Sequence, residues 1–591
     1  MKKIKYKYII PAILVVIVAF AACKKSFLDK PPLGTLSPAI IASEPGIQGL
    51  LIGAYSLVDG AGASGDDQTS AASNWVFGGV TGDDAYKGSD PTDFSSIAVL
   101  EDWSITPTSS VTGPKWNLCY AGAQRCNAVI NTLAIAKGIS ATEATQITAQ
   151  ARFLRAYYHM ELKKVYGNPI FVDETVSPQN TKVDNSKDIW PRIEDDLKYA
   201  VANLPETFGQ VGRANKWAAQ ALLAKAYMFE KNYAAAYPLL KDIITNGKTT
   251  SGVKYALLPH FFSNFNPAQK NSSESIFAAQ TSVQDGSSTD WGADPNGNYG
   301  DILNFPYTGG PGACCGFYNP SQDLANAFKT DATGLPLLDT WYTGLSVSDP
   351  AAPYVGTLDP RIDLTMGRKG IPYLDWGAHP GDSWIRNPVN DGHFNPRKNV
   401  YAASQKGAYT DVGSAYWGPT ELVANNVNLI RYADVILWAA ECAQQAADIP
   451  AAMNYVNMIR ARASDPTGWV YNGSDYDAPS ATYKTQTTPA DNYKIGLYTA
   501  ATFTAANASK AIYFERRLEL AMEGTRFFDL VRWGIADQTL NSYYAREKAL
   551  RPLKISAHWT AGKNEYIPIP QGEVDNLNAD GTVRIKQNPG Y

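Results

Sequence analysis

The residues with the clearest chemical potential are three glutamates near the C-terminus, within residues 510–534. Glu515, Glu519 and Glu523 recur at i, i+4 and i+8, a spacing that places the three carboxylates in a row along one face of an α-helix. Paired carboxylates do the acid–base work of glycoside hydrolysis. One interpretation of this stretch is therefore catalytic.

Arginines in the same stretch favour a structural interpretation instead. Glutamates at i, i+4 repel each other and destabilise an isolated helix by about 0.2–0.5 kcal/mol per pair, so something must neutralise them. Four arginines are available, namely Arg516, Arg517, Arg526 and Arg532. A neighbouring cation keeps the pKa of a carboxyl low rather than raising it to that of a proton donor. We therefore favour an Arg–Glu lattice that fixes one helix inside a larger helical body.

Glycines are expected to divide the stretch into two helices. Gly524 interrupts the helical pattern, and Gly534 follows the second apolar segment as a C-cap. If the lattice is buried, Glu519→Ala or Arg526→Ala should cost about 3–5 kcal/mol of folding stability.

No other motif makes a strong case for catalysis, a cofactor or a metal. The five histidines have no HExxH or similar spacing, and no GxSxG elbow or dinucleotide fingerprint occurs. The cysteines after Cys23 include no CxxC pair, which excludes a zinc site of the usual spacing. Oxygen-rich side chains between Asp290 and Asp301 leave an irregular cation site open. Cys314 and Cys315 are adjacent, and either a strained disulfide or two thiols fits them.

The composition describes a globular chain without a case for nucleic acid. The 591 residues carry 52 Lys and Arg against 56 Asp and Glu, a net charge of −4, and no basic stripe appears. Tyrosine (34) and tryptophan (14) are abundant, and 47 glycines with 36 prolines imply long irregular connections. At this length we expect one large composite domain or two to three domains.

The N-terminus predicts a lipid anchor. Lysines precede an apolar run at residues 9–22, which is too short to span a bilayer and suits a signal peptide. The run ends in Ala21-Ala22-Cys23, which resembles the bacterial lipobox. We expect residues 1–22 to be removed and Cys23 to be lipidated, so that the mature protein is anchored to a membrane rather than spanning it.

Helical periodicity dominates most of the chain, so we predict a mainly α fold. Helices are expected at residues 47–58, 116–136, 145–166, 186–203, 217–245, 427–446 and 451–463. Residues 217–245 show the helix–turn–helix spacing of a tetratricopeptide unit. Helix pairs of this kind stack and bury a continuous core, which makes them a scaffold.

Two loop-like regions interrupt the helices, residues 60–102 and a large insertion at residues 281–420. The insertion holds 19 of the 47 glycines and many aromatic residues. Each aromatic side chain could form a small local core, which is the favoured interpretation for any single one, or stand exposed as a flat platform for a ligand. Our candidates for ligand binding are Trp75, Tyr86, Trp291, Tyr299, Tyr307 and Trp341.

Motifs in a fixed order carry a resemblance over nearly the whole chain. They are the lipobox at Cys23, RFLRAYY at residues 152–158, residues 214–227, NLIRYADV at 428–435, ERR at 515–517, EGTRFFDL at 523–530, YIPIP at 566–570 and QNPGY at 587–591. Together they resemble the SusD-like (RagB/SusD) surface glycan-binding lipoproteins of Bacteroidetes. The resemblance divides the chain into an N-terminal helical region at residues 23–280 and a C-terminal region at residues 281–591.

The resemblance also implies a function. Family members carry four tetratricopeptide-like helix pairs and bind oligosaccharides on a loop-rich face through aromatic side chains. They have no catalytic step, and they act as a lid on a SusC-like TonB-dependent transporter in the outer membrane, facing the cell exterior. A lid for peptide uptake is the alternative, and a glycoside hydrolase is a more distant one that rests only on abundant carboxylates.

Overall fold

The computed structural model describes residues 41–63, 67–176, 183–287, 296–312, 314–348, 354–412, 422–577 and 581–591. Cys23, the expected lipidation site, lies outside these ranges. Within them, no helix combines the length and the apolar character that crossing a bilayer requires.

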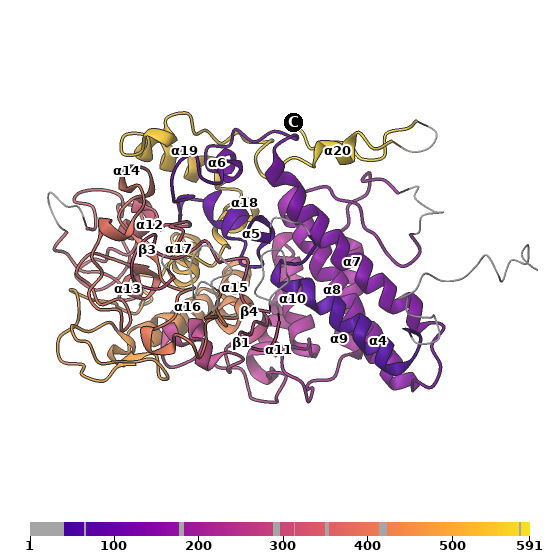
Figure 1. Cartoon of the computed structure of the whole chain (residues 1–591). Coiled ribbons are helices and arrows are strands. Elements are labelled where there is room, and N and C mark those ends of the chain that lie inside the picture. Colours follow the sequence, from indigo (N-terminus) through magenta and orange to yellow (C-terminus); the bar gives the residue numbers. More distant parts are fainter. Residues whose placement is uncertain are drawn as a thin grey trace, which may run out of the picture.

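Eight helices form a continuous packed series, which confirms the mainly α prediction. Each helix packs against the next one in the series, and the N-terminal members fill the right-hand side of Figure 1. The members, in order, are α4 (Glu44–Ser56), α7 (Gly113–Leu133), α8 (Ala141–Tyr166), α9 (Trp190–Asn203), α10 (Lys216–Phe229), α11 (Tyr233–Asn246), α15 (Tyr432–Gln445) and α16 (Ile449–Ala463).

Local sequence signals explain where these helices begin. The side chain of Ser140 caps α8 by accepting a hydrogen bond from the backbone N–H of Glu143, and Asn215 caps α10 in the same way. Such caps satisfy backbone donors that a helix cannot pair internally. Asp448 caps α16. Because these signals are local, the sequence placed the helices to within a few residues.

One predicted helix was wrong at its start. Residues 427–431 form strand β4 (Val427–Arg431), which pairs in antiparallel fashion with β1 (Ser275–Ala279), and only then does α15 begin. The two partner strands are about 150 residues apart in the chain. A stretch of sequence as long as one helix therefore contains no information about the distant strand with which these five residues pair.

The C-terminal stretch folds as two helices joined at Gly524. They are α17 (Ala508–Leu520), which packs against α15 and α16, and α18 (Arg526–Trp533), which Gly534 ends in a left-handed conformation. Gly524 also has a positive φ of 65°, and a Cβ there would lie 1.9 Å from the backbone oxygen of Ser73. Only glycine allows the two segments to approach this closely.

The loop-rich regions gather on the left and at the top of Figure 1. Short elements hold them, and isolated bridges join residues 85 and 88 to residues 320 and 317. These elements are α5 (Asp67–Ser70), a π-helical turn (Trp75–Val80), α6 (Ser95–Glu101), α12 (Gln322–Ala327), α13 (Ile362–Thr365), β2 (Met366–Gly367), α14 (Pro388–Asp391), β3 (Asn395–Pro396), β5 (Tyr476–Asp477), β6 (Thr482–Tyr483), α19 (Ala536–Glu547) and α20 (Gln571–Val574).

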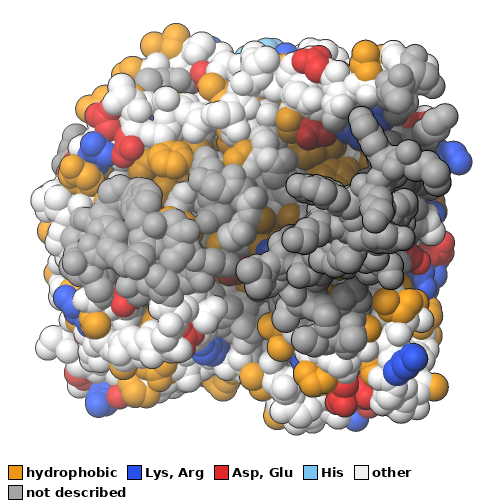
Figure 2. Space-filling view, turned by 45° about the vertical axis from the view of Figure 1, so that its right-hand side comes forward, with side chains coloured by type: hydrophobic (Ala, Val, Ile, Leu, Met, Phe, Trp, Pro, Cys, Tyr) orange, Lys and Arg blue, Asp and Glu red, His pale blue; other side chains and the backbone are white. Residues whose placement is uncertain are grey.

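Surface charge is mixed rather than segregated. On the described part of the face in Figure 2, acidic and basic side chains lie scattered among uncharged ones. This distribution agrees with the small net charge of −4.

Candidate functional site

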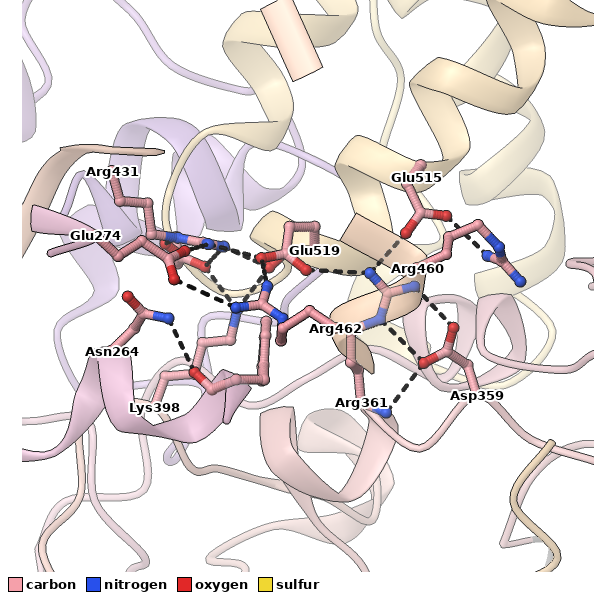
Figure 3. A network of polar contacts seen from close by, with 12 residues as sticks. Asn264, Glu274, Asp359, Arg361, Lys398, Arg431, Arg460, Arg462, Glu515 and Glu519 are labelled. Carbon is pink, nitrogen blue, oxygen red and sulfur yellow. Dashed lines mark hydrogen bonds and ion pairs between the residues drawn. The ribbon is translucent and has the colours of Figure 1, made fainter. Parts of the chain in front are cut away.

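Glu515 and Glu519 of α17 lie in a buried Arg–Glu lattice (Figure 3). Glu523 was predicted on the same helix face, but α17 ends at Leu520 and Glu523 lies in the turn after it. Glu519, which is fully buried, receives Arg431 at 2.6 Å and Arg361 at 3.1 Å, and Arg462 pairs with the same carboxylate. Glu515 pairs with Arg361 at 2.7 Å and with Arg460 at 2.8 Å. The structural interpretation of the row is thereby confirmed, although most of its arginines come from distant segments.

The electrostatics of the lattice oppose an acid–base role. Burial alone would raise the pKa of Glu519, but the charges of Arg462, Arg431 and Arg361 outweigh it and hold the pKa well below its ordinary value of 4.5. The pKa of Glu523 is likewise lowered, because Arg431 and Lys398 outweigh the effect of burial. These carboxylates stay ionised and paired at neutral pH, so neither can donate a proton to a substrate.

Two of the four arginines of the stretch itself, Arg517 and Arg526, reach the loops. Arg517 pairs with Asp84 at 2.8 Å and with Asp83 at 3.0 Å, and Arg526 pairs with Asp83 at 2.7 Å. The same contacts therefore fasten the loop at residues 81–88 to the helical body. These ion pairs hold the loop in position and do not themselves form a binding site.

Two of the predicted ligand-binding aromatic residues are buried. Trp75 and Tyr86 both have an exposed fraction of 0%. The indole N–H of Trp75 donates to the backbone oxygen of Gly300, and the hydroxyl of Tyr86 donates to Glu547 at 2.8 Å. Both rings fill the core beneath the loop, so neither offers a face to a ligand in this conformation. The glycine-rich sequence around them was misleading, because the close packing of a π-helical turn also uses glycine.

The other four candidates lie in different surroundings. Trp291 lies outside the described residues, and Tyr299 is half-buried against the core. Tyr307 and Trp341 are also half-buried, and each lies beside an arginine. Among the described candidates, these last two belong to groups with an accessible aromatic face.

Tyr307 forms part of the first aromatic surface. The guanidinium of Arg386 lies 4.9 Å from the centre of its ring and pairs with Ser89 at 2.8 Å. The backbone N–H of Tyr307 donates to the carbonyl of Trp384, whose indole covers Gly309 and Gly310. A side chain on either glycine would collide with the indole, so the glycines allow a large half-exposed ring to lie flat on the loop.

Trp341 forms the second aromatic surface with Tyr342. The two rings meet edge to face with centroids 5.0 Å apart, and Tyr342 is 44% exposed. Arg546 from α19 lies 4.8 Å from the ring of Tyr342 and is oriented by Asp323. Trp341 in turn packs on Phe514 of α17. The exposed ring is thus held by a rigid helix, which suits the stacking of a flat ligand face.

Several described carboxyls have raised pKa values, and most of them are buried. Glu230 at the end of α10 is half-buried, and burial together with the neighbouring Glu194 raises its pKa to about 7. Burial raises the pKa of Asp391 to about 8 and that of Glu547 to about 7. Their side chains belong to residues that are only 3% and 2% exposed. A substrate could not reach a proton on either group.

The described residues offer little further evidence for a metal site or a reactive cysteine. No group of three His, Cys, Asp or Glu side chains in these ranges could hold a metal ion. Cys314 and Cys315 are joined by a disulfide, one of the two arrangements that the sequence left open. Cys119, Cys126 and Cys442 are buried free thiols.

Tyr342 and Trp384 were not among the six candidates. Tyr342 directly follows a candidate tryptophan, and Trp384 follows Gly381 and Asp382 in a typical turn sequence. Loop aromatic residues beside an exposed arginine form the useful signal here, but the arginines are brought in by other segments. Sequence spacing alone could not rank these rings above their neighbours.

Comparisons with known proteins agree on one family. Residues 273–591 match the model described as "SusD family", and residues 27–228 match the model described as "Starch-binding associating with outer membrane". "SusD-like protein P25" of Formosa agariphila is 24% identical over 440 residues, which cover 71% of this chain and 70% of the relative. A "SusD-like protein" of Bacteroides ovatus is 26% identical over 376 residues, which cover 60% and 63%.

Solved structures share the fold. A "Laminarin binding SusD-like protein" superposes with a TM-score of 0.66 at 22% identity, covering 93% of this chain and all of the other. "Surface glycan-binding protein A from Bacteroides thetaiotaomicron in complex with laminarihexaose" gives 0.63 at 21% identity, covering 92% and 99%.

Proposed function

The chain belongs to the SusD family, and from this premise we propose that it binds glycans for import without catalysing their hydrolysis. In this proposal the protein is a lipoprotein anchored through Cys23 on the outer face of the outer membrane. It captures oligosaccharides and passes them to a SusC-like TonB-dependent transporter. The domain division proposed with it is a helical region at residues 23–280 and a loop-bearing region at residues 281–591.

The observation that carries the proposal is the aromatic pair of half-buried Trp341 and exposed Tyr342, backed by Arg546. An aromatic ring offers a large rigid face that stacks on a sugar ring at little entropic cost. A cationic side chain beside the ring can donate hydrogen bonds to hydroxyl groups. Tyr307 with Trp384 and Arg386 provides the same combination on a second loop.

Two features support a binding role over a hydrolytic one. The glutamate row is neutralised by basic side chains, and Asp391 and Glu547, two carboxyls with raised pKa values, are buried. Stacking on surfaces that remain wet at their rims gives modest binding, so we expect Kd values roughly between micromolar and millimolar.

The direct test is affinity electrophoresis and calorimetry with neutral polysaccharides and their oligosaccharides. We expect retardation by at least one glycan and no release of sugar. Tyr342→Ala and Trp384→Ala should each weaken binding about tenfold, which corresponds to about 1.4 kcal/mol. Tyr199→Ala is the matched control, because its half-buried ring also lies under an arginine, Arg152 at 4.4 Å, but on α9.

The outcomes separate the alternatives. Unchanged binding in both surface variants would reject these two surfaces as the glycan site. Binding of peptides but not of any glycan would favour peptide uptake, and sugar release by the purified protein would favour a hydrolase. Loss of the Cys23→Ala variant from the membrane fraction would support the lipid anchor. Co-purification of a TonB-dependent β-barrel with the parent protein would support the transporter partner.

A further inference from the structure

A pocket lies beside the lattice, and six of the fifteen residues that line it are asparagines. It has a volume of about 60 Å³ and is open to solvent on one side. The residues come from the turn after α17, the segments around residues 300 and 398, and β4. The amides are Asn298, Asn304, Asn399, Asn425, Asn426 and Asn428.

Two amide oxygens of this wall are buried and have no hydrogen-bond donor. Asn304 donates to Asp301 at 3.3 Å, and Asn425 donates to the backbone oxygen of Phe265 at 2.8 Å. Their Oδ1 atoms accept nothing, although the residues are only 1% and 4% exposed. A buried polar atom without a partner costs about 1–3 kcal/mol. A ligand that donates hydrogen bonds to these oxygens would offset this cost.

The charges of the wall disfavour an anionic ligand. Asp301 is buried and receives only neutral donors, Ser73 at 2.6 Å and Asn298 at 2.8 Å besides Asn304. Lys398 is the single cationic residue among those that line the pocket, and its ammonium is already bound to Glu523 at 2.7 Å. Burial raises the pKa of Asp301 above its ordinary value. In its ionised form Asp301 would repel a carboxylate or sulfate, for which the wall offers no free cation.

The size and the apolar part of the wall narrow the ligand further. The apolar and aromatic residues of the lining are Phe265, Tyr318, Pro396, Val427 and Met522. The pocket therefore presents an apolar surface beside convergent amides, as ligand sites commonly do. A cavity needs only about 10–15 Å³ of this kind of volume to hold one water molecule, so about 60 Å³ accommodates a few hydroxyl-sized groups.

We propose that this pocket binds the hydroxyl-bearing edge of one neutral sugar residue and thereby selects neutral glycans over uronate-containing or sulfated ones. Hydroxyl groups supply the donors that Asn304 and Asn425 lack, and they accept hydrogen bonds from the neighbouring amides. Carboxylates and sulfates supply no donor and add a repelling charge. The inference rests on the proposed function and adds a specificity to it.

The first test compares glycan classes by calorimetry. We expect a neutral glucan oligosaccharide to bind at least tenfold more tightly than a polyuronate or sulfated oligosaccharide of the same length. Asp301→Asn keeps the shape of the side chain and removes its charge. This variant should reduce the preference at least threefold, an effect that a loss of stability alone would not produce.

The second test removes the amides. Asn399→Ala, at the half-exposed rim, and Asn425→Ala should each weaken binding of the neutral ligand about five- to tenfold. Asn185→Ala is the matched control, because this residue is 2% exposed and donates to two backbone oxygens at 2.9 and 2.8 Å in a different part of the fold. The control should bind as the parent does.

The failures are distinguishable. If the parent binds no neutral glycan, the proposed function fails and this inference fails with it. If Tyr342→Ala loses affinity but Asn399→Ala and Asn425→Ala do not, only this inference is overturned. Equal affinity for a polyuronate would overturn it as well, as would saturable binding of calcium alone that Asp301→Asn abolishes.

Discussion

Two adjacent polar regions of this protein differ in whether their buried side-chain oxygens have partners. In the lattice around α17, buried carboxylates such as Glu519 are matched by arginines on several sides. In the neighbouring pocket, the amide oxygens of Asn304 and Asn425 are buried without a partner. The regions meet at Lys398 and Glu523, which belong to both. The paired region fixes the fold, and the unpaired one is available to a ligand.

This difference reflects the cost of each kind of group. A buried ion pair broken on one side leaves an uncompensated charge, at about 3–5 kcal/mol. A neutral amide oxygen left unpaired costs less, about 1–3 kcal/mol, and a ligand can recover that cost on binding. A protein can therefore keep unsatisfied amides at a site at a lower cost than unpaired charged carboxylates in a core.

Acidification should lower the stability of the lattice more than any single substitution does, because it acts on all of its carboxylates at once. The pKa values of Glu519 and Glu523 are lower in the folded state than their ordinary value of 4.5. Their contribution to stability is therefore complete above about pH 4.5 and is lost as the pH falls through the folded-state values, at about 1.4 kcal/mol per pKa unit.

Urea unfolding at a series of pH values measures this loss. The free energy of unfolding should fall steadily below pH 4.5, and Glu519→Gln should show a shallower dependence than the parent protein. Equal slopes for the two proteins would contradict the assignment.

Glu519→Ala should be the most damaging single substitution considered. It leaves Arg361, Arg431 and Arg462 close together without their shared carboxylate, and we expect a loss of about 3–5 kcal/mol. Chemical denaturation gives the loss, and calorimetry on the protein that remains folded should give an unchanged glycan affinity. Retained stability with lost sugar binding would place Glu519 in the binding site instead.

Arg526→Ala should cost less than the sequence suggested. The side chain of Arg526 is 11% exposed, and its partner Asp83 keeps a second arginine, Arg517 at 3.0 Å. We expect about 1.5–3 kcal/mol, the range for a hydrogen bond to a charged group. The same denaturation experiment measures it, and a loss as large as that of Glu519→Ala would show that the two arginines do not substitute for each other.

Lys510→Ala should have the smallest effect. Lys510 pairs with Asp339 on the surface, where the side chains are 52% and 72% exposed. Solvent screens such pairs, which contribute about 0–1 kcal/mol. A thermal unfolding midpoint within experimental error of the parent's is expected, and a clear decrease would mean that exposure alone does not separate the lattice from ordinary surface pairs.

Much of the scaffold was predictable because its signals are local. Ser140 and Asn215 mark helix starts in the sequence, and Gly534 marks an end. The start of α15 was not predictable, since residues 427–431 become a strand only through β1, about 150 residues earlier. The candidate rings were predictable as a class but not as individuals, as the burial of Trp75 and Tyr86 shows.

By itself, the sequence determined the helical scaffold, the family and the structural role of the glutamate row, because spacing along one helix and ordered motifs are properties of the chain. Only the tertiary structure decided which partners neutralise Glu519, which aromatic rings are exposed and that the asparagines converge on one pocket. Arg361, Arg431 and Arg462 reach one carboxylate from separate segments. Convergence of this kind depends on long-range packing, which no local pattern of residues encodes.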